Sequence, residues 1–253
     1  GTNGKTTTSR LVAQLLRQRG RSCGVIGTLG ATLGNEVDAG ANTTPDPVSL
    51  QRQLAEWVDR DIGVVSMEVS SHALVQGRVN GVAFESAIYT NLSHDHLDYH
   101  GSMDAYGRAK LRLFAWEGLR RAVINADDPF APRVRGVVDK DVEVLTYSAT
   151  GGAADVRVVN ARFDSGGVRG DMHTPWGMAP FTSPLIGEFN LANLAAAVTA
   201  LVHSEEELMA TLEAAVNLQP VPGRMQVVTN SLDLQVIVDY AHTPQALEQV
   251  LQA

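Results

Sequence analysis

Cysteine is almost absent from this chain of 253 residues, and long apolar runs are missing altogether. The single cysteine, Cys23, excludes an internal disulfide and suits a reducing compartment, so we expect a cytoplasmic protein. No apolar run approaches the roughly 20 residues that a membrane-spanning helix needs. The sequence therefore predicts a protein with no membrane partner.

Basic residues are also scarce, with 20 lysines and arginines against 28 acidic residues and a net charge of -8. This balance argues against nucleic acid as the main partner, because phosphate backbones are bound by Lys and Arg. Small phosphate ligands need only a few well-placed donors and are not excluded. The composition, 44% hydrophobic and 19% charged, is typical of a globular protein with a real core.

Segments of apolar β-forming residues alternate with helical patterns through the first part of the chain. This alternation implies crossover connections and a largely parallel sheet with helices on both faces, an α/β fold. Such a sheet places its ligands at the carboxyl ends of the strands. The predicted strands are 22–28, 62–69, 84–90, 122–125 and 143–147, and the predicted helices are 5–19, 48–59 and 103–116.

The pattern changes after residue 153. Residues 154–185 alternate without a helical period and contain Gly166 and Gly167, which predicts a small antiparallel part built from hairpins. Two helices are expected next, at 190–203 and 205–217.

Pro220, Pro222 and Gly223 then interrupt the pattern and indicate a domain linker. A strand at 234–239 and a helix beginning at Pro244 follow, as expected for the start of a Rossmann-like domain. We therefore expect a P-loop central domain at 1–223 and the beginning of a second domain at 224–253.

The chain opens on Gly-Thr-Asn-Gly-Lys-Thr-Thr, the end of a phosphate-binding loop. Glycines let backbone N–H groups converge on an anion, and the helix that follows adds its positive end. Lys5 is expected to contact phosphates and the Thr6 hydroxyl to bind Mg²⁺. The alternative is a glycine-rich turn that only caps a helix. The strict motif requires a preceding strand and glycine ahead of Gly1, so we expect a fragment of a longer protein.

Acidic and histidine side chains follow two of the predicted strands. Glu68 ends the strand 62–69, where a carboxylate suits Mg²⁺, although a solvated strand-end glutamate is an equal alternative. The segment His94–His100 holds three histidines and two aspartates, which could bind metal or form a polar loop. Its spacing matches no zinc pattern.

Four further residues can be interpreted on local grounds. Lys110 lies inside a predicted helix, where a solvated lysine is the usual case. Helix capping and surface polarity explain Ser70 and Gln76, and only Arg78 indicates an anionic ligand.

Taken together, these motifs resemble the Mur ligase family along the entire chain. Residues 1–7 resemble the ATP loop of the family, and residues 42–45 resemble its muramyl-peptide segment. The Ser-Ser-His sequence after Glu68 resembles one branch in particular, because sibling enzymes share the loop and the glutamate but differ after it. That branch attaches the third amino acid to UDP-MurNAc-L-Ala-D-Glu.

The resemblance implies a nucleotide site with Mg²⁺. Thr6 and Glu68 would bind Mg²⁺, His96 would be a further metal ligand, and Lys110 would be carbamylated and bind a second Mg²⁺. Arg224 would reach the γ-phosphate, and Lys5, His96, Lys110 and Arg224 would be the catalytic residues. The ATP-binding residues would be Gly1, Thr2, Asn3, Gly4, Lys5, Thr6, Thr7, Asn190, Asn193, Arg224 and Asp239.

A second group of residues would contact the UDP-MurNAc-dipeptide. The reaction implied is an ATP-dependent amide ligation through an acyl phosphate, adding diaminopimelate or, as the alternative, lysine. The full-length protein would be a cytoplasmic monomer. Rival interpretations are a sibling amide ligase, namely the D-Glu-adding Mur enzyme or folylpolyglutamate synthase, and a non-catalytic P-loop module. The substrate residues would be Asn42, Thr43, Thr44, Ser70, Gln76 and Arg78.

Overall fold

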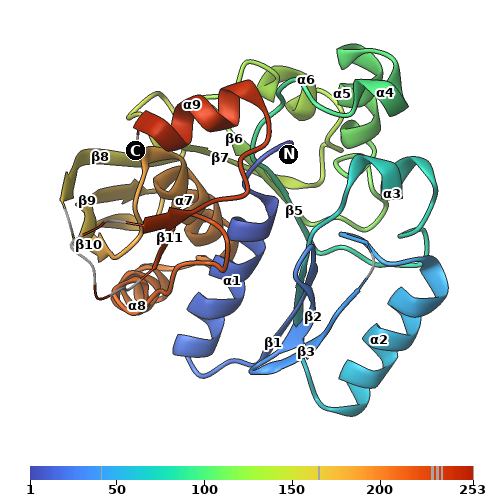
Figure 1. Ribbon diagram of the computed structural model, residues 1–253, viewed down its shortest axis with the longest axis horizontal. Coiled ribbons are helices and arrows are strands. Elements are labelled where there is room, and N and C mark those ends of the chain that lie inside the picture. Colours follow the sequence, from blue (N-terminus) through green and yellow to red (C-terminus); the bar gives the residue numbers. More distant parts are fainter. Residues whose placement is uncertain (41, 165, 229–230, 232–233, 235, 253) are drawn as a thin grey trace.

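A computed structural model describes residues 1–40, 42–164, 166–228, 231, 234 and 236–252. Its strands form a four-stranded sheet, a six-stranded sheet and a two-stranded ribbon. Helices lie on both sides of the sheets (Figure 1). The predicted α/β fold with a mostly parallel sheet and a small antiparallel part is confirmed.

The first sheet has the order β3-β2-β1-β4. β1 (Cys23–Gly27) is fully buried and runs parallel to β4 (Val64–Met67). β2 (Gly30–Leu33) and β3 (Glu36–Asp38) add an antiparallel hairpin to the other edge of β1. The sequence did not predict this hairpin because β3 is three exposed residues long and carries no alternating apolar pattern.

The second sheet has the order β10-β9-β8-β7-β6-β5 and is parallel from β5 to β8. The two hairpins that end it are antiparallel, which confirms the prediction for 154–185. The strands are β5 (Ser86–Tyr89), β6 (Arg121–Asn125), β7 (Glu143–Ser148), β8 (Val156–Asp164), β9 (Gly167–Thr174) and β10 (Gly177–Ser183).

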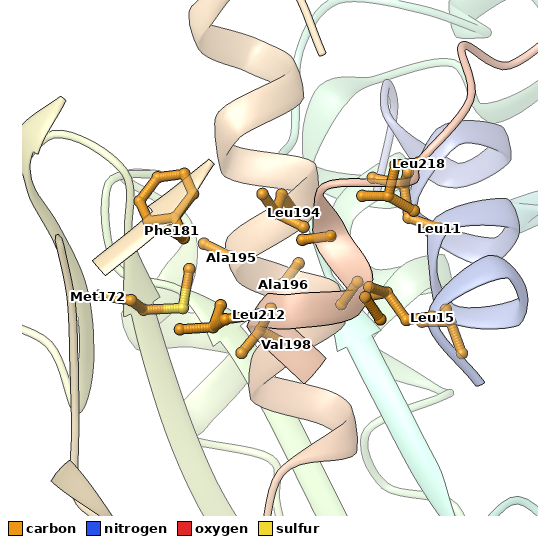
Figure 2. Close-up of a cluster of buried hydrophobic side chains, with 14 of the residues drawn as sticks. Leu11, Leu15, Met172, Phe181, Leu194, Ala195, Ala196, Val198, Leu212 and Leu218 are labelled. Atoms are coloured by element: carbon orange, nitrogen blue, oxygen red, sulfur yellow. The ribbon is translucent and has the colours of Figure 1, made fainter. Parts of the chain in front are cut away.

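The main core surrounds α7 (Glu188–Leu201), whose residues from Leu194 to Val198 are all buried. A helix that is apolar on every side must be covered on every side. Figure 2 shows α7 between α1 (Lys5–Gln18) and the side chains of β9 and β10, with α8 (Glu205–Ala215) closing the cluster. The helix that follows the phosphate loop is thus anchored in the largest core of the molecule.

The other long helices carry the caps that their sequences supply. Asp46 accepts hydrogen bonds from the first turn of α2 (Pro47–Asp59), and Ser102 caps α5 (Met103–Leu111). α5 ends at Leu111 and continues as turns, so the predicted helix 103–116 is too long. Three helices of five residues or fewer were not predicted because they contain less than two turns of periodicity. These are α3 (Ser71–Val75), α4 (Leu97–His100) and α6 (Ala131–Arg135).

The last segment forms a ribbon and a helix. β11 (Gln226–Val228) pairs antiparallel with β12 (Val236–Val238), and α9 (Pro244–Gln252) follows a Thr243 cap as predicted. Within the predicted strand 234–239, Gln235 lies outside the described residues. Among the helices of the described residues, none is long and apolar enough to cross a membrane.

A cavity of about 730 Å³ separates the two large sheets. β4 and β5, the edge strands of the two sheets, line it together with residues of α1 such as Val12 and Leu16. The carboxyl ends of both strands meet the same loop, because Glu68 bonds to Thr6 and Thr90 bonds to Asn3. The lining of this cavity includes Lys5, Glu68 and Thr90, so it adjoins the phosphate loop.

Candidate functional site

The phosphate loop has the backbone geometry that its glycines predict. Gly4 adopts φ 81° and directly precedes α1, so the free N–H groups of the first turn border the loop. A Cβ built on Gly4 would lie 2.4 Å from Asn193 Oδ1. Only glycine fits this position, on account of both the positive φ and the close approach of Asn193.

Residues 90–93 after β5 brace the loop from the side. The Thr2 N–H donates to the Asn91 carbonyl at 2.9 Å, and the Asn3 N–H donates to Asn91 Oδ1 at 2.8 Å. Thr90 Oγ1 donates to the Asn3 carbonyl at 2.6 Å. The Ser93 N–H in turn donates to Thr2 Oγ1 at 3.0 Å. The phosphate loop is thus held by residues 90–93, whose contacts with it the sequence did not predict.

A second layer supports this brace from the end of β6. Asn125 Nδ2 donates to the Thr90 carbonyl at 2.6 Å. Asp128 accepts from the Leu92 N–H at 3.0 Å and from the Tyr89 hydroxyl at 2.7 Å. The signal for this layer was the Asn-Ala-Asp-Asp sequence at a strand end, where polar side chains meet the ligand edge of an α/β sheet.

Lys5, Thr6 and Glu68 form the centre of the site. Lys5 Nζ donates to the carbonyls of Gly1 and Thr2 at 3.0 and 2.7 Å, and burial lowers its pKa against the opposing effect of Glu68. Thr6 Oγ1 donates to Glu68 Oε2 at 3.0 Å. The buried Glu68 carboxylate also accepts from the Thr28 N–H at 2.8 Å, a contact that the sequence did not predict.

The donor set at Thr6 and Glu68 fits Mg²⁺. Both side chains offer oxygen, the ligand that Mg²⁺ prefers, and they already lie within hydrogen-bond distance of each other. Among the described residues, no three His, Cys, Asp or Glu side chains are close enough to hold a metal by themselves. A Mg²⁺ ion here would therefore need ligands from a phosphate, as is usual for nucleotide sites.

Arg224 comes to the loop from the other end of the chain. Its Nη2 donates to Thr6 Oγ1 at 3.3 Å, and its guanidinium lies over the Tyr240 ring at 4.5 Å. Beside it is a cavity of about 280 Å³, lined by Thr7, Asn190, Arg224 and apolar side chains such as Leu185 and Ile186. A small cavity with apolar walls next to a phosphate loop suits a planar base.

Asn193, Asn190 and Asp239 have partners inside the protein. Asn193 Oδ1 accepts from Thr8 Oγ1 at 3.1 Å, and Asn190 Nδ2 donates to the Ile186 carbonyl at 2.8 Å. Asp239 accepts from the Met225 and Ala241 N–H groups at 2.8 and 2.7 Å. Their roles toward a nucleotide stay predictions.

Lys110 is buried rather than solvated, contrary to the usual case for a lysine within a helix. Its Nζ lies 4.1 Å above the Tyr106 ring, and the side chain is 7% exposed. Desolvation holds its pKa well below the ordinary value, with Lys5 adding to the effect and Asp95 opposing it. A buried amine of this kind is a neutral nucleophile at lower pH than a surface lysine.

His96 lies in a group of rings near Lys110. It adopts φ 52° at the start of α4, 3.5 Å from Asp95, and its ring is 5.9 Å from that of Tyr106. His72 lies 4.9 Å from His96. His96 and Lys110 thus both border Tyr106, as far as the described contacts go, and the metal role of each stays a prediction.

The residues predicted to bind the muramyl-dipeptide form a strip beside Glu68. Thr44 is fully buried; its hydroxyl donates to the Glu68 carbonyl at 2.8 Å and accepts from the Ser70 N–H at 3.1 Å. Arg78 donates to the Thr44 carbonyl at 2.9 Å and to Gln76 Oε1 at 2.8 Å. Thr43 Oγ1 lies 3.1 Å from Thr28 Oγ1, Ser70 caps α3, and Asn42 is exposed.

The family model described as Mur ligase middle domain matches residues 1–201. The chain belongs to the Mur ligase family. A relative from Pseudomonas aeruginosa PAO1 is 49% identical over all 253 residues and is named UDP-N-acetylmuramoyl-L-alanyl-D-glutamate--2,6-diaminopimelate ligase. A relative from Coxiella burnetii with the same name is 44% identical over the whole chain. The chain spans about half the length of these curated relatives, 52% and 53%.

Solved structures show the same family similarity. A structure of UDP-N-acetylmuramoyl-L-alanyl-D-glutamate--2,6-diaminopimelate ligase matches with a TM-score of 0.87 at 40% identity, covering 100% of this chain and 52% of that one. An FPGS–AMPPCP complex matches with a TM-score of 0.75 at 16% identity, covering 100% of this chain and 70% of that one, which shows the shared fold. The Mur ligase fold thus unites the phosphate loop, Glu68 and Arg224 at one sheet edge.

Proposed function

We propose that this Mur ligase chain is the ATP-binding core of an enzyme that joins diaminopimelate to UDP-MurNAc-L-Ala-D-Glu. One observation carries the proposal: Glu68 belongs to two groups of residues at once. Its carboxylate accepts from Thr6 of the phosphate loop, and its carbonyl accepts from Thr44 of the muramyl segment. Glu68 thus joins a residue of the phosphate loop to a residue of the muramyl segment. This proximity suits phosphoryl transfer between ATP and a bound carboxylate.

The names of the relatives support the substrate pair. The Pseudomonas and Coxiella relatives are both named as 2,6-diaminopimelate ligases, and their similarity extends over the whole chain. We therefore assign the proposed substrates as UDP-MurNAc-L-Ala-D-Glu and diaminopimelate, with lysine as the alternative amino acid.

In this proposal the residues around the loop bind and polarise ATP. N–H groups at the start of α1 and Lys5 contact the phosphates, and Asn190 lies by the base in the small cavity. Thr6 and Glu68 hold Mg²⁺, which neutralises charge on the phosphate oxygens. The hydrogen bond from Arg224 to Thr6 Oγ1 supports a contact between its guanidinium and the terminal phosphate.

The reaction follows from this placement. A γ-carboxylate oxygen of D-Glu attacks the γ-phosphorus of ATP, ADP leaves, and an acyl phosphate forms. The amine of diaminopimelate then attacks the acyl carbon, phosphate leaves, and the amine loses a proton as the amide forms. Lys5 and Arg224 stabilise the charge that develops during the first transfer.

Lys110 in this proposal acts as a carbamate. A carbamate forms when a neutral amine attacks CO₂, and the buried Lys110 amine has the lowered pKa that this step needs. The product carries anionic oxygens in place of an ammonium, so it can contribute ligands to a second Mg²⁺ together with His96.

Three broader features belong to the same proposal. Residues 1–223 form the nucleotide-binding domain, and residues 224–253 begin a second domain that supplies Arg224 and Asp239. The full-length ligase acts as a monomer in the cytoplasm.

The test uses the full-length protein that contains this chain. ADP formation should require UDP-MurNAc-L-Ala-D-Glu and diaminopimelate together. UDP-MurNAc-L-Ala, a folate and lysine should each fail to replace the correct substrate. Equal turnover with a folate or with UDP-MurNAc-L-Ala would assign the protein to a sibling ligase, and ATP binding without any ligation would indicate a non-catalytic module.

A further inference from the structure

α3 is too short to be stable by itself. It is five residues long, and helices of this length do not form in isolation. Its position is therefore set by contacts with the rest of the molecule. α3 and its flanks carry Ser70, Gln76 and Arg78, three of the six residues assigned to the muramyl-dipeptide.

Contacts to α3 come from the segment that carries the metal-site residues. His100 Nε2 lies 2.9 Å from Ser71 Oγ. Gln76 Nε2 donates to the Tyr99 hydroxyl at 3.2 Å, and Arg112 Nη1 donates to the Leu74 carbonyl at 3.1 Å. α4 and α5, the source of these partners, lie directly beside α3 (Figure 1).

The Ser71 contact differs from the others in its burial. Ser71 is 3% exposed, and His100 is the partner recorded for its hydroxyl within the described part of the chain. A buried hydroxyl that loses its partner is strongly unfavourable, so this pair, together with the Ser70 cap, holds the start of α3.

His100 also contacts Tyr106, a residue next to the phosphate loop. Its ring lies 5.1 Å from that of Tyr106, inclined by 33°. The Tyr106 hydroxyl donates to Thr2 Oγ1 of the phosphate loop at 3.2 Å, and Lys110 Nζ lies 4.1 Å above the same ring. Packed and hydrogen-bonded groups therefore run without interruption from Ser71 through His100 and Tyr106 to the loop.

We propose that His100 is a positioning residue that couples the muramyl-dipeptide site on α3 to the nucleotide site. In this proposal it acts through its contacts with Ser71 and Tyr106. The inference rests on the proposed function and adds a link between its two sites. A shift of the phosphate loop or of Lys110 on nucleotide binding moves Tyr106 and His100, and through Ser71 it moves the helix that holds the second substrate.

The experiment measures binding to the full-length protein by calorimetry. The Kd for UDP-MurNAc-L-Ala-D-Glu is determined with and without Mg²⁺ and a non-hydrolysable ATP analogue. In the wild type the analogue should tighten binding by about fivefold or more, within the usual range of coupling between sites. In His100→Ala and in Ser71→Ala this ratio should fall below about twofold.

Two further variants separate coupling from simple damage. The double variant should show the same ratio as the single ones, because both substitutions break one link. His100→Gln places an amide nitrogen near the position of Nε2 and should keep most of the ratio. Ser204→Ala removes the cap of α8, far from the site, and should lower the Tm while leaving the ratio unchanged.

Each outcome has one meaning. A wild-type ratio near one, unchanged ratios in His100→Ala and Ser71→Ala, or additive effects in the double variant would overturn the coupling. If the wild type fails to bind UDP-MurNAc-L-Ala-D-Glu at all, the proposed function itself fails.

Discussion

The two substrate regions of the site differ in the burial and hydrogen bonding of their polar side chains. On the nucleotide side, Thr6 and Glu68 are 6% and 3% exposed, and the loop before them is bonded to residues 90–93. On the muramyl side, Asn42 and Gln76 are exposed, and the Gln76 and Arg78 side chains bond to each other. One region is buried and bonded to the rest of the protein, whereas the other presents polar side chains at the surface.

The difference reflects what each region has to bind. A triphosphate needs several N–H groups held at fixed positions, and a rigid loop avoids the entropy of ordering them at each turnover. A sugar nucleotide with a peptide is long, and many separate contacts along its length can position its one reactive carboxylate. We therefore expect the nucleotide side to tolerate little change and the muramyl side to respond mainly through affinity.

The largest effect is expected at Lys110, which lies where the two regions meet. Lys110→Ala should lower kcat of the full-length enzyme by about a thousandfold, since it removes a group that stabilises charge in the transition state. Acetate or propionate should restore part of the activity by supplying a carboxylate in the space of the carbamate. Arg108→Ala, on the exposed face of the same helix, is the matched control and should stay near wild type. Full activity of Lys110→Ala would refute its proposed role.

Arg78 tests whether the muramyl side acts through affinity. Arg78→Ala should raise the KM for UDP-MurNAc-L-Ala-D-Glu by roughly 30- to 150-fold, which corresponds to about 2–3 kcal/mol for a charged hydrogen bond. The KM for ATP should remain within about twofold of wild type, because Arg78 bonds to Thr44 and Gln76 and not to the loop. Arg60→Ala, which loses an exposed ion pair with Glu36, serves as the control. Equal effects on both KM values would make Arg78 a structural residue.

Gly4 tests the rigidity of the nucleotide side. Gly4→Ala adds a methyl group against Asn193 at a positive φ and should lower the free energy of unfolding by about 1–3 kcal/mol. The KM for ATP should rise by about tenfold as the loop shifts. Gly20→Ala has a similar φ of 75° and nothing within 4 Å of its Cβ, so it reports the backbone strain alone. Identical losses in both variants would mean that Asn193 does not confine the loop.

The smallest effect concerns stability and pH. The Lys110 pKa is lowered in the folded chain, so between that pKa and the ordinary lysine value the unfolded chain binds more protons and stability rises with pH. Lys110→Met removes this group; the variant should be more stable than wild type near neutral pH, by roughly 1–3 kcal/mol for a buried polar group without a full set of partners. The difference in stability between the variant and the wild type should disappear as pH approaches 10. Urea unfolding of both proteins in CO₂-free buffer between pH 6 and 10 measures this difference. A difference independent of pH would contradict the burial of a titrating amine.

The sequence predicted the fold where its patterns are long. The strands β1 and β4 to β7, the hairpins after residue 153 and the helices α1, α7 and α8 all follow from apolar periodicity that extends over several residues. It missed the hairpin of β2 and β3 and the helix α3, which are stabilised by tertiary contacts rather than by a pattern of their own.

The candidate site was predicted as a set of residue types and not as a geometry. Lys110 had a solvated interpretation on local grounds, and only the fold shows it buried above Tyr106. Asn91, Asn125 and Asp128 were not predicted because each acts through contacts between strands that are distant in sequence. Burial and long-range hydrogen bonds depend on the topology, and local sequence does not reveal them.

The pairing of β1 and β6 has a consequence for amide hydrogen exchange. Strands in the middle of an α/β protein normally have N–H groups bonded on both sides and exchange with solvent only on global unfolding. β1 is paired with β2 and β4, and β6 is paired with β5 and β7. The amides of Cys23–Gly27 and Arg121–Asn125 should therefore exchange with deuterium far more slowly than those of the exposed edge strand β3.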